Sequence, residues 1–408
     1  MISRKKICIV TTRHISYNPR VLKEADVLSA AGYDVVVVTL NNSLPQSMFD
    51  QELMRSRPWT LRTVDARKTG SVERLRWLGQ SVKQKLYTRL AGLSLGFGIA
   101  ERAAQRGFDA LTRLAKRERA DLYLVHHAEA LGIGAAAARY NQALLGFDAE
   151  DFHRGMNGMD TRAAGLIFFL ENKYLPRCVY FSAASRGIGE AYRRDYGIKE
   201  PLVLLNVFPR ETIAPIQVNR PVRFYWYSQV IGPNRGLERL IEAAGRLDGL
   251  FEVHLRGTMQ TGYRQEMDRL IGAAGLEGKV FFHEPILAAA LIGEGSRYDV
   301  GLALEKNSSE NAMICVSNKL FSYLMSGLAV IATDTDGQKD ILLSFPQAGI
   351  LCGMDDAETL AAAMKGYLDH PDRLAQARAA ARLAAEGRFN WETEAGKLLD
   401  HMKKLLAN

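Results

Sequence analysis

The chain has 408 residues, an apolar fraction of 47%, a charged fraction of 24% and a net charge of +8. A single hydrophobic core seldom grows past roughly 250–300 residues, so this length predicts two domains. No stretch is apolar enough to supply the ~20 residues that span a bilayer. The apolar run 7–10 is too short for the core of a signal peptide. The cysteines are few and far apart, which predicts reduced thiols rather than disulfides or a metal cluster: Cys8, Cys178, Cys315 and Cys352.

The positive charge is concentrated in the first half of the chain. Residues 1–200 carry 31 Lys and Arg against 20 Asp and Glu, whereas residues 201–408 carry 22 against 25. This asymmetry indicates a first domain that meets a polyanion or an anionic membrane, although a solvated basic surface would give the same numbers.

The first half alternates short apolar runs with helical patterns. Residues 7–10 predict a strand, Asn18 and Pro19 predict the start of a helix, and the continuous apolar run 34–40 predicts a strand buried on both faces. Further strands are expected at 122–125, 143–147, 179–183 and 202–205. Such alternation is typical of an α/β domain with a doubly wound parallel sheet.

One segment of the first half, residues 67–93, departs from this alternation. Seven cations stand against the single acid Glu73 up to Arg89, and apolar side chains recur among them at helical spacing. The pattern predicts an amphipathic helix on an anionic membrane surface. An ordinary helix with a solvated basic face is the alternative, and no recognition motif for nucleic acid accompanies the charge.

The alternation restarts after a proline-rich stretch, which predicts four parts in the chain. These are a first domain (1–208), a linker (209–221), a second domain (222–385) and a C-terminal helix (386–408) that packs back on the first domain. In the second domain, strands are expected at 222–227, 251–255, 280–283, 300–304 and 328–332, and helices at 236–247, 262–274, 318–326 and 357–368.

The strongest local signal is a predicted helix start at Ser317, Asn318 and Lys319. Ser317 can act as the N-cap, and Gly327 ends the helix before a buried strand. A helix start directs unpaired N–H groups and the positive end of the dipole outward, so it favours phosphate. Lys319 is poorly placed for that dipole unless an anion binds there.

These residues carry a resemblance to a known family. SNKLFSYLMSGLAVIAT resembles the NKLFEYMxxGxPVIA signature of GT-B glycosyltransferases of the retaining family 4 type (group 1). The runs that begin at Asn18, Phe224 and Phe389 resemble the family's first helix, the opening of its donor domain and its last helix. The resemblance implies a GT-B fold, two Rossmann-like domains that face a cleft, with the acceptor held by the first domain and a UDP- or GDP-linked sugar by the second.

The resemblance also implies roles for individual residues. For the donor they are Arg235, Ser317, Asn318, Lys319, Ser322, Thr258 and Ile286, with Glu305 as a further candidate. The catalytic candidates His127, Asp151 and His153 stand where the family places residues that face the transferred sugar and the acceptor. Asn18 and Arg20 lie at the first strand–helix turn, which also faces the acceptor cleft. The family's paired glutamates are absent, because Ile314 and Ser322 occupy those positions.

The chemistry implied is the loss of a nucleoside diphosphate from the anomeric carbon. Arg235, Lys319 and the helix start could stabilise the leaving phosphate, so no metal ion or other cofactor is expected. The run Asp334 to Asp336 mimics a metal-binding DxD motif, but a polar loop is favoured. A retaining route needs no enzymic base, whereas an inverting route needs Asp151, His153 or His127. His126 and His127 are adjacent, so only one of them is expected to face the cleft.

The leading hypothesis is a glycosyltransferase that acts on a saccharide or lipid-linked acceptor in the synthesis of surface polysaccharide. We expect a cytoplasmic protein, peripheral at the inner face of the plasma membrane. A catalytically weak module that binds nucleotide sugar or saccharide is a second hypothesis, motivated by the missing glutamates. A nucleotide-sugar epimerase of GT-B fold is a third.

Overall fold

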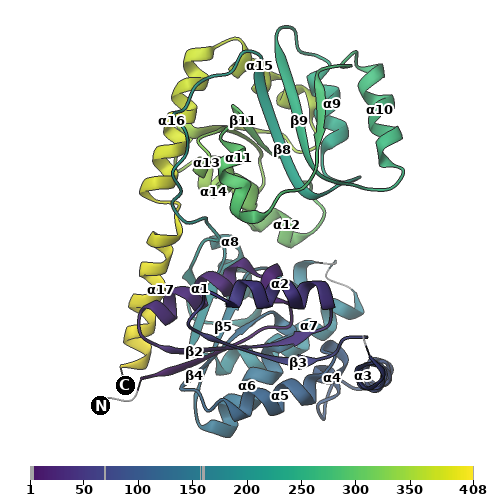
Figure 1. The fold of residues 1–408 in the computed structure, drawn as a ribbon, viewed down its shortest axis with the longest axis vertical. Helices are drawn as coiled ribbons and strands as arrows, with labels where there is room; N and C mark the ends of the chain where they lie inside the picture. Colours follow the sequence, from purple (N-terminus) through teal and green to yellow (C-terminus); the bar gives the residue numbers. More distant parts are fainter. Residues whose placement is uncertain (1–3, 69, 157, 159–160, 408) are drawn as a thin grey trace. The chain divides into compact units, whose positions relative to one another are not determined.

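The computed structural model describes residues 4–68, 70–156, 158 and 161–407 (Figure 1). The chain divides into two compact units. Unit 1 comprises Met1–Ala184, Ile188–Leu204 and Ala395–Asn408, and unit 2 comprises Ser185–Gly187 and Leu205–Glu394.

Unit 1 is built on a parallel sheet with the strand order β3-β2-β1-β4-β5-β6-β7. Its strands are β1 (Lys6–Val10), β2 (Asp34–Asn41), β3 (Thr60–Asp65), β4 (Leu122–His126), β5 (Leu144–Ala149), β6 (Tyr180–Ala183) and β7 (Leu202–Val203). Its helices are α1 (Pro19–Ala30), α2 (Leu44–Met54), α3 (Ser71–Leu90), α4 (Ile99–Ala104), α5 (Phe108–Arg117), α6 (Leu131–Asn141), α7 (Arg162–Tyr174) and α8 (Arg186–Tyr196), with the short turns η1 (Ile15–Tyr17), η2 (Ala128–Ala130), η3 (His153–Met156) and η4 (Leu175–Arg177).

Both faces of this sheet are covered by helices (Figure 1). The run Val35 to Val38 in β2 is at most 2% exposed, as the continuous apolar sequence predicts for a strand buried on both sides. One face packs on α1 and on the C-terminal helix α17 (Trp391–Leu406), which contributes Leu398, Met402 and Leu406 to the core. The last residues of the chain therefore complete the core of unit 1.

Unit 2 has a second parallel sheet, in the order β10-β9-β8-β11-β12-β13. Its strands are β8 (Val222–Ile231), β9 (Phe251–Met259), β10 (Val280–His283), β11 (Val300–Ala303), β12 (Ala329–Thr333) and β13 (Gly349–Cys352). Its helices are α9 (Leu237–Ala244), α10 (Tyr263–Ala273), α11 (Leu291–Gly295), α12 (Glu310–Ile314), α13 (Asn318–Met325), α14 (Asp336–Leu342), α15 (Ala357–Leu368) and α16 (Pro371–Gly387), with the turns η5 (Ala288–Ala290) and η6 (Pro346–Ala348).

The predicted class, two doubly wound parallel sheets in series, is confirmed. Two edge strands, β3 and β13, were not predicted. β3 has the sequence TLRTVD and is only partly buried, so its weak apolar alternation gives little signal. Within the described residues, no helix combines the length and the apolar composition that crossing a bilayer requires.

Candidate functional site

The sheet of unit 2 reverses its winding between β8 and β11. From β8 the chain proceeds to β9 and β10 on one side, and from β11 to β12 and β13 on the other. In doubly wound sheets, ligands bind outside the carboxyl ends of the strands at this switch point. Arg235 follows β8 and Glu305 follows β11, so the topology puts both residues at that place.

Glu305 holds the predicted donor residues together. Its Oε1 atom accepts a hydrogen bond from Lys319 Nζ at 2.6 Å and one from Ser317 Oγ at 2.8 Å. Burial alone would raise the pKa of this carboxyl group, but Lys319, Ser317 and the nearby charge of Arg235 outweigh burial and lower it. Glu305 is therefore ionised, and it sits among the cations that the sequence assigns to the diphosphate.

The start of α13 is open to an anion. Ser317 occupies the N-cap position, but its hydroxyl donates to Glu305 instead of capping an N–H group. Asn318 is exposed at the first helical position. The first-turn N–H groups thus receive no side-chain cap from Ser317, and the positive end of the helix dipole is free to meet phosphate.

Arg235 lies in the turn between β8 and α9 and is exposed. Gly236 follows it with φ +77°, and a Cβ there would lie 3.2 Å from Leu304 Cβ. A glycine is required at this position because its backbone is left-handed and passes close to the end of β11. This approach brings Arg235 into the electrostatic range of Glu305.

Ser322, predicted to meet the donor, is 1% exposed. Its hydroxyl pairs with Tyr227 Oη at 2.8 Å and donates to the carbonyl of Lys319. Tyr227, which belongs to β8, was missed by the sequence reasoning because it lies 95 positions away along the chain. Ser322 stands at the position where the resemblance places a glutamate.

Thr258 and Ile286 lie on neighbouring strand ends of the same sheet. Thr258 is exposed near the end of β9, and Ile286 is partly buried in the loop after β10. The buried Arg256 holds that loop by donating to the carbonyl of Glu284 at 2.8 Å, and it pairs with Glu294 at 2.6 Å. Arg256 is thus a positioning residue that no motif indicated.

The sheet of unit 1 has its own switch point, between β1 and β4. His127 lies directly after β4 with φ 70°, and its Nδ1 atom is 3.2 Å from the hydroxyl of Thr11, which follows β1. Burial disfavours the charged imidazolium and lowers the pKa of His127 to about 3. His127 is therefore a neutral hydrogen-bonding group at physiological pH.

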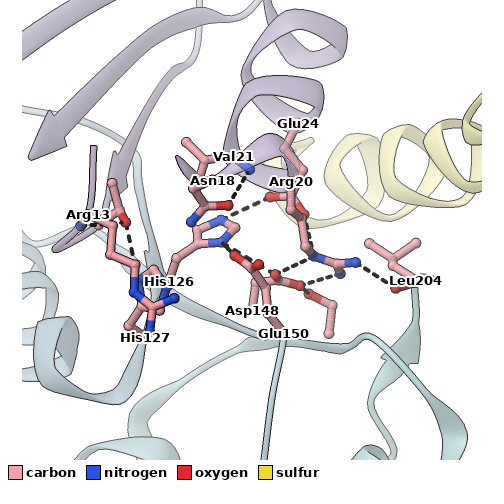
Figure 2. A network of polar contacts seen from close by, with 12 residues as sticks. Arg13, Asn18, Arg20, Val21, Glu24, His126, His127, Asp148, Glu150 and Leu204 are labelled. Atoms are coloured by element: carbon pink, nitrogen blue, oxygen red, sulfur yellow. Dashed lines mark hydrogen bonds and ion pairs between the residues drawn. The ribbon is translucent and has the colours of Figure 1, made fainter. Parts of the chain in front are cut away.

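His126 has a different set of partners from His127, as expected for adjacent residues at a strand end (Figure 2). It is fully buried, 3.1 Å from Glu24 and from Glu150, and 3.4 Å from Asp148. Burial opposes its charge, but these carboxylates outweigh burial and raise its pKa to about 10. His126 thus carries a proton inside a network of buried charges.

Arg20 is the other cation of this network. It is 0% exposed and donates to both oxygens of Asp148 at 2.6 Å and to the carbonyl of Leu204 at 2.7 Å. Asn18 is 2% exposed and accepts the N–H of Val21 as the N-cap of α1. Both side chains were predicted to face the acceptor, but both are buried. Arg20 points inward because the buried carboxylates attract its guanidinium group, and Asn18 is occupied as the cap of α1.

The network also contains three groups with the geometry of metal ligands. Glu24, His126 and Asp148 offer ligand atoms that all lie within 4.8 Å of one another. The lone pairs of Asp148 already accept two bonds from Arg20 and one from Ser182. We interpret the cluster as an ion-pair network, in which Arg20 supplies the charge that a cation would otherwise bring.

His153 approaches His127 with a distance of 6.1 Å between the ring centroids. Its Nδ1 atom lies 3.0 Å from Tyr192 Oη, and Tyr192 donates to Glu171 at 2.6 Å. Since the Tyr192 proton goes to Glu171, the Tyr192 oxygen is free to accept a hydrogen bond from Nδ1 of His153. Nε2 is buried and has no hydrogen-bond partner among the described residues.

Asp151 lies in the loop between β5 and η3, two residues before His153, and it is partly exposed. The structure thus brings together His127 and His153, with Asp151 in the adjoining loop. Glu171, Tyr192 and Tyr196 were missed, because the tyrosines lie on α8 and the carboxylate on α7, and only the fold joins them.

The opposite pKa shifts of the two adjacent histidines predict a stability maximum near neutral pH. Between pH 6.5 and about 3 an unfolded chain protonates His127 but the folded chain does not, so stability falls with falling pH. Between pH 6.5 and about 10 the folded chain keeps the His126 proton, so stability falls with rising pH. Calorimetry at pH 5, 7 and 9 should show both losses in the transition of unit 1, each on the order of 1 kcal/mol.

Substitution separates the two limbs of this pH profile. His127→Asn, which suits the positive φ, should flatten the acid limb and leave the alkaline limb unchanged. An alkaline limb that disappears together with the acid limb would contradict the assignment of one limb to each histidine.

Comparisons with known proteins agree with this fold. Residues 234–400 match the model of the glycosyl transferase-like family, whereas no curated protein matches the chain. HepE from Anabaena, solved with UDP, has a TM-score of 0.70 at 15% identity over 98% of this chain and 100% of that one. Sucrose-phosphate synthase from Thermosynechococcus elongatus has a TM-score of 0.72 at 16% identity, and the match covers 99% of this chain and 100% of that one. The lipopolysaccharide outer core galactosyltransferase WaaB has a TM-score of 0.64 at 12% identity, and the match covers 98% of this chain and 100% of that one.

The fold of both units is thus the GT-B fold, and the family match covers the part of the chain that holds Arg235, Glu305 and Lys319.

Proposed function

We propose that the chain transfers a sugar from a nucleoside diphosphate sugar to a saccharide or lipid-linked acceptor. The observation that carries the proposal is the cluster of Arg235, Glu305, Ser317 and Lys319 at the switch point of unit 2. Two cations and an open helix start form a site of the right charge for a diphosphate. HepE has been solved with UDP and with UDP-glucose, which supports a UDP-sugar as the first donor to test.

The reaction requires stabilisation of a leaving group. As the bond between the anomeric carbon and the diphosphate breaks, negative charge grows on the β-phosphate oxygen. Lys319, Arg235 and the N–H groups of α13 are the groups that would stabilise this oxygen. The proposed route uses these groups and needs no metal ion or other cofactor. Glu305 orients Lys319 and would release it partly to the donor when the diphosphate binds.

We propose that the anomeric configuration is retained, with the leaving phosphate accepting the acceptor proton. An inverting reaction would instead require a base, and His153 is the candidate that the geometry favours, because its buried Nε2 atom has no hydrogen-bond partner among the described residues. His127, with its pKa lowered to about 3, would serve as a hydrogen-bonding group for substrate hydroxyls. The configuration of the product at the anomeric carbon, read by NMR, separates the two routes.

The biological setting is proposed to be surface polysaccharide or glycoconjugate synthesis at the inner face of the plasma membrane. The name of WaaB describes transfer to lipopolysaccharide, which supports a saccharide carried on lipid as the acceptor class to test.

The experiment is a panel of UDP- and GDP-linked sugars incubated with the purified full chain. Released nucleoside diphosphate is measured, binding is measured by calorimetry, and the sugar is followed by NMR. Release that is accelerated by an oligosaccharide acceptor supports the transferase. Tight donor binding without release from any donor and acceptor would instead indicate a binding module, and conversion of one nucleotide sugar into another would indicate an epimerase.

A further inference from the structure

The helix α3 turns an apolar stripe away from unit 1. Leu75, Leu78, Val82 and Leu86 recur at intervals of three and four residues and are 69%, 43%, 65% and 54% exposed. Such spacing puts the four side chains on one face of the helix. Beyond the helix end, Leu93 is 88% exposed. Surface helices of soluble domains normally bury this face.

The opposite face of α3 is the more polar one, and it packs on unit 1. Gln84 Nε2 donates to the carbonyl of Ala103 at 3.1 Å, and Trp77 lies under the charged groups of Lys68 and Arg106. The helix lies beside α4 at the margin of the unit (Figure 1). The helix therefore packs on its own unit with its more polar face and turns its apolar face outward. The apolar stripe requires a partner other than unit 1.

Cations border the stripe on both edges. Arg74 and Lys85 lie along one edge, and Arg76 and Lys83 lie along the other. Arg89 continues the line of the stripe at the last turn of the helix. Lys83 is paired with Asp109. Among the described residues, Arg74, Lys85 and Arg89 have no carboxylate within ion-pair distance, and all three are exposed.

A polar depression of about 170 Å³ adjoins the edge marked by Lys83, between α3 and α5. Its cationic lining residues are Lys83, Arg102, Arg106 and Arg113, against the single carboxylate of Asp109. The Nε atom of Arg106 is buried without a hydrogen-bond partner in the described part of the chain. The positive field thus extends from the stripe into this depression.

We propose that α3 lies in the plane of an anionic bilayer surface. The stripe enters the boundary of the acyl chains, and the flanking cations meet lipid phosphates. A second copy of the chain is the weaker fit, because pairing two stripes would set rows of like charges against each other. An apolar groove on another protein is also a weaker fit, because it offers no negative charge to the cations on both edges of the stripe. The inference rests on α3 and the cations beside it, and it does not depend on the proposed sugar transfer.

The test is co-sedimentation of the full chain with vesicles of phosphatidylcholine, alone or mixed with phosphatidylglycerol. We expect recovery with the anionic vesicles, little with the neutral ones, and a loss of binding at high salt. Val82→Ser with Leu86→Ser should weaken binding by tenfold or more. Each of Arg74→Gln, Lys85→Gln and Arg89→Gln should weaken it by about fivefold.

Matched substitutions elsewhere control for general effects. Leu383→Ser removes an apolar side chain that is 70% exposed on α16, and Arg264→Gln with Arg269→Gln removes exposed cations on α10. These variants should bind as the unchanged chain does, and all variants should keep their thermal transitions because the changed residues are exposed. Equal recovery with neutral vesicles, or binding unaffected by the α3 substitutions, would overturn the proposal. So would dimerisation in ultracentrifugation that depends on the stripe. Release of nucleoside diphosphate in solution is measured in parallel, so failure of the transferase is seen separately.

Discussion

Replacing Asp148 by Asn is expected to destabilise unit 1 by about 3–5 kcal/mol. Asp148 is 0% exposed and accepts two bonds from Arg20 at 2.6 Å. The substitution removes the negative charge and leaves the shape, so the guanidinium stays buried with less compensation. Urea unfolding followed by circular dichroism measures the loss, and an exposed pair supplies the control. Glu52→Gln breaks the pair with Arg55, both largely exposed, and should change stability by less than about 1 kcal/mol.

The pair Asp148 and Arg20 can also be tested as a unit. Arg20→Met alone should be strongly destabilising, because it leaves His126 as the remaining cation beside Asp148 and Glu24. The double variant with Asp148→Asn should cost clearly less than the sum of the two single variants. Strictly additive losses would contradict the view that these side chains act together.

Replacing Lys319 by Ala is expected to lower donor turnover by about 10²–10³-fold. The variant loses a cation that we propose stabilises the developing phosphate charge, and it also frees the Glu305 carboxylate to repel the diphosphate. Released nucleoside diphosphate at saturating donor measures kcat, and its dependence on donor concentration measures KM. Lys319→Arg should keep part of the rate, since it keeps the charge.

A second substitution divides the effect of Lys319 into its two parts. Lys319→Ala combined with Glu305→Gln should recover donor KM but not kcat, because only the repulsion is removed. Lys365→Ala, which breaks an exposed pair with Asp369 on α15, is the matched control and should leave both constants unchanged. Full activity in Lys319→Ala would remove the basis of the proposed donor site.

The sequence carried enough information for the two sheets and for the helix start at Ser317. Both rest on local patterns, namely continuous apolar runs for buried parallel strands and an N-cap residue before a helical repeat. The pairing of Arg20 with Asp148 could not be predicted, because the two residues are 128 positions apart and no local pattern links them. Arg20 at the start of α1 therefore looked like a residue of the cleft, whereas burial and opposite charge hold it inside.

The same reason accounts for the residues that were missed around the predicted histidines. His153 was predicted from its position in a motif, but Glu171 and Tyr192 contact it from two helices that only the fold brings together. In the same way, Lys319 was predicted from the helix start, whereas Glu305 was only one of several loop carboxylates until the structure showed its bonds to Lys319 and Ser317.

The position of α17 has a consequence for how the protein is made. Leu398, Met402 and Leu406 belong to the core of unit 1, yet they follow unit 2 along the chain and leave the ribosome after it. Domains usually fold from the N-terminus during synthesis, but here the core of unit 1 closes only after unit 2 has been translated. A nascent chain that has completed unit 2 still exposes an apolar face of unit 1 beside α1. Premature termination within the last helix would therefore damage the domain that was translated first.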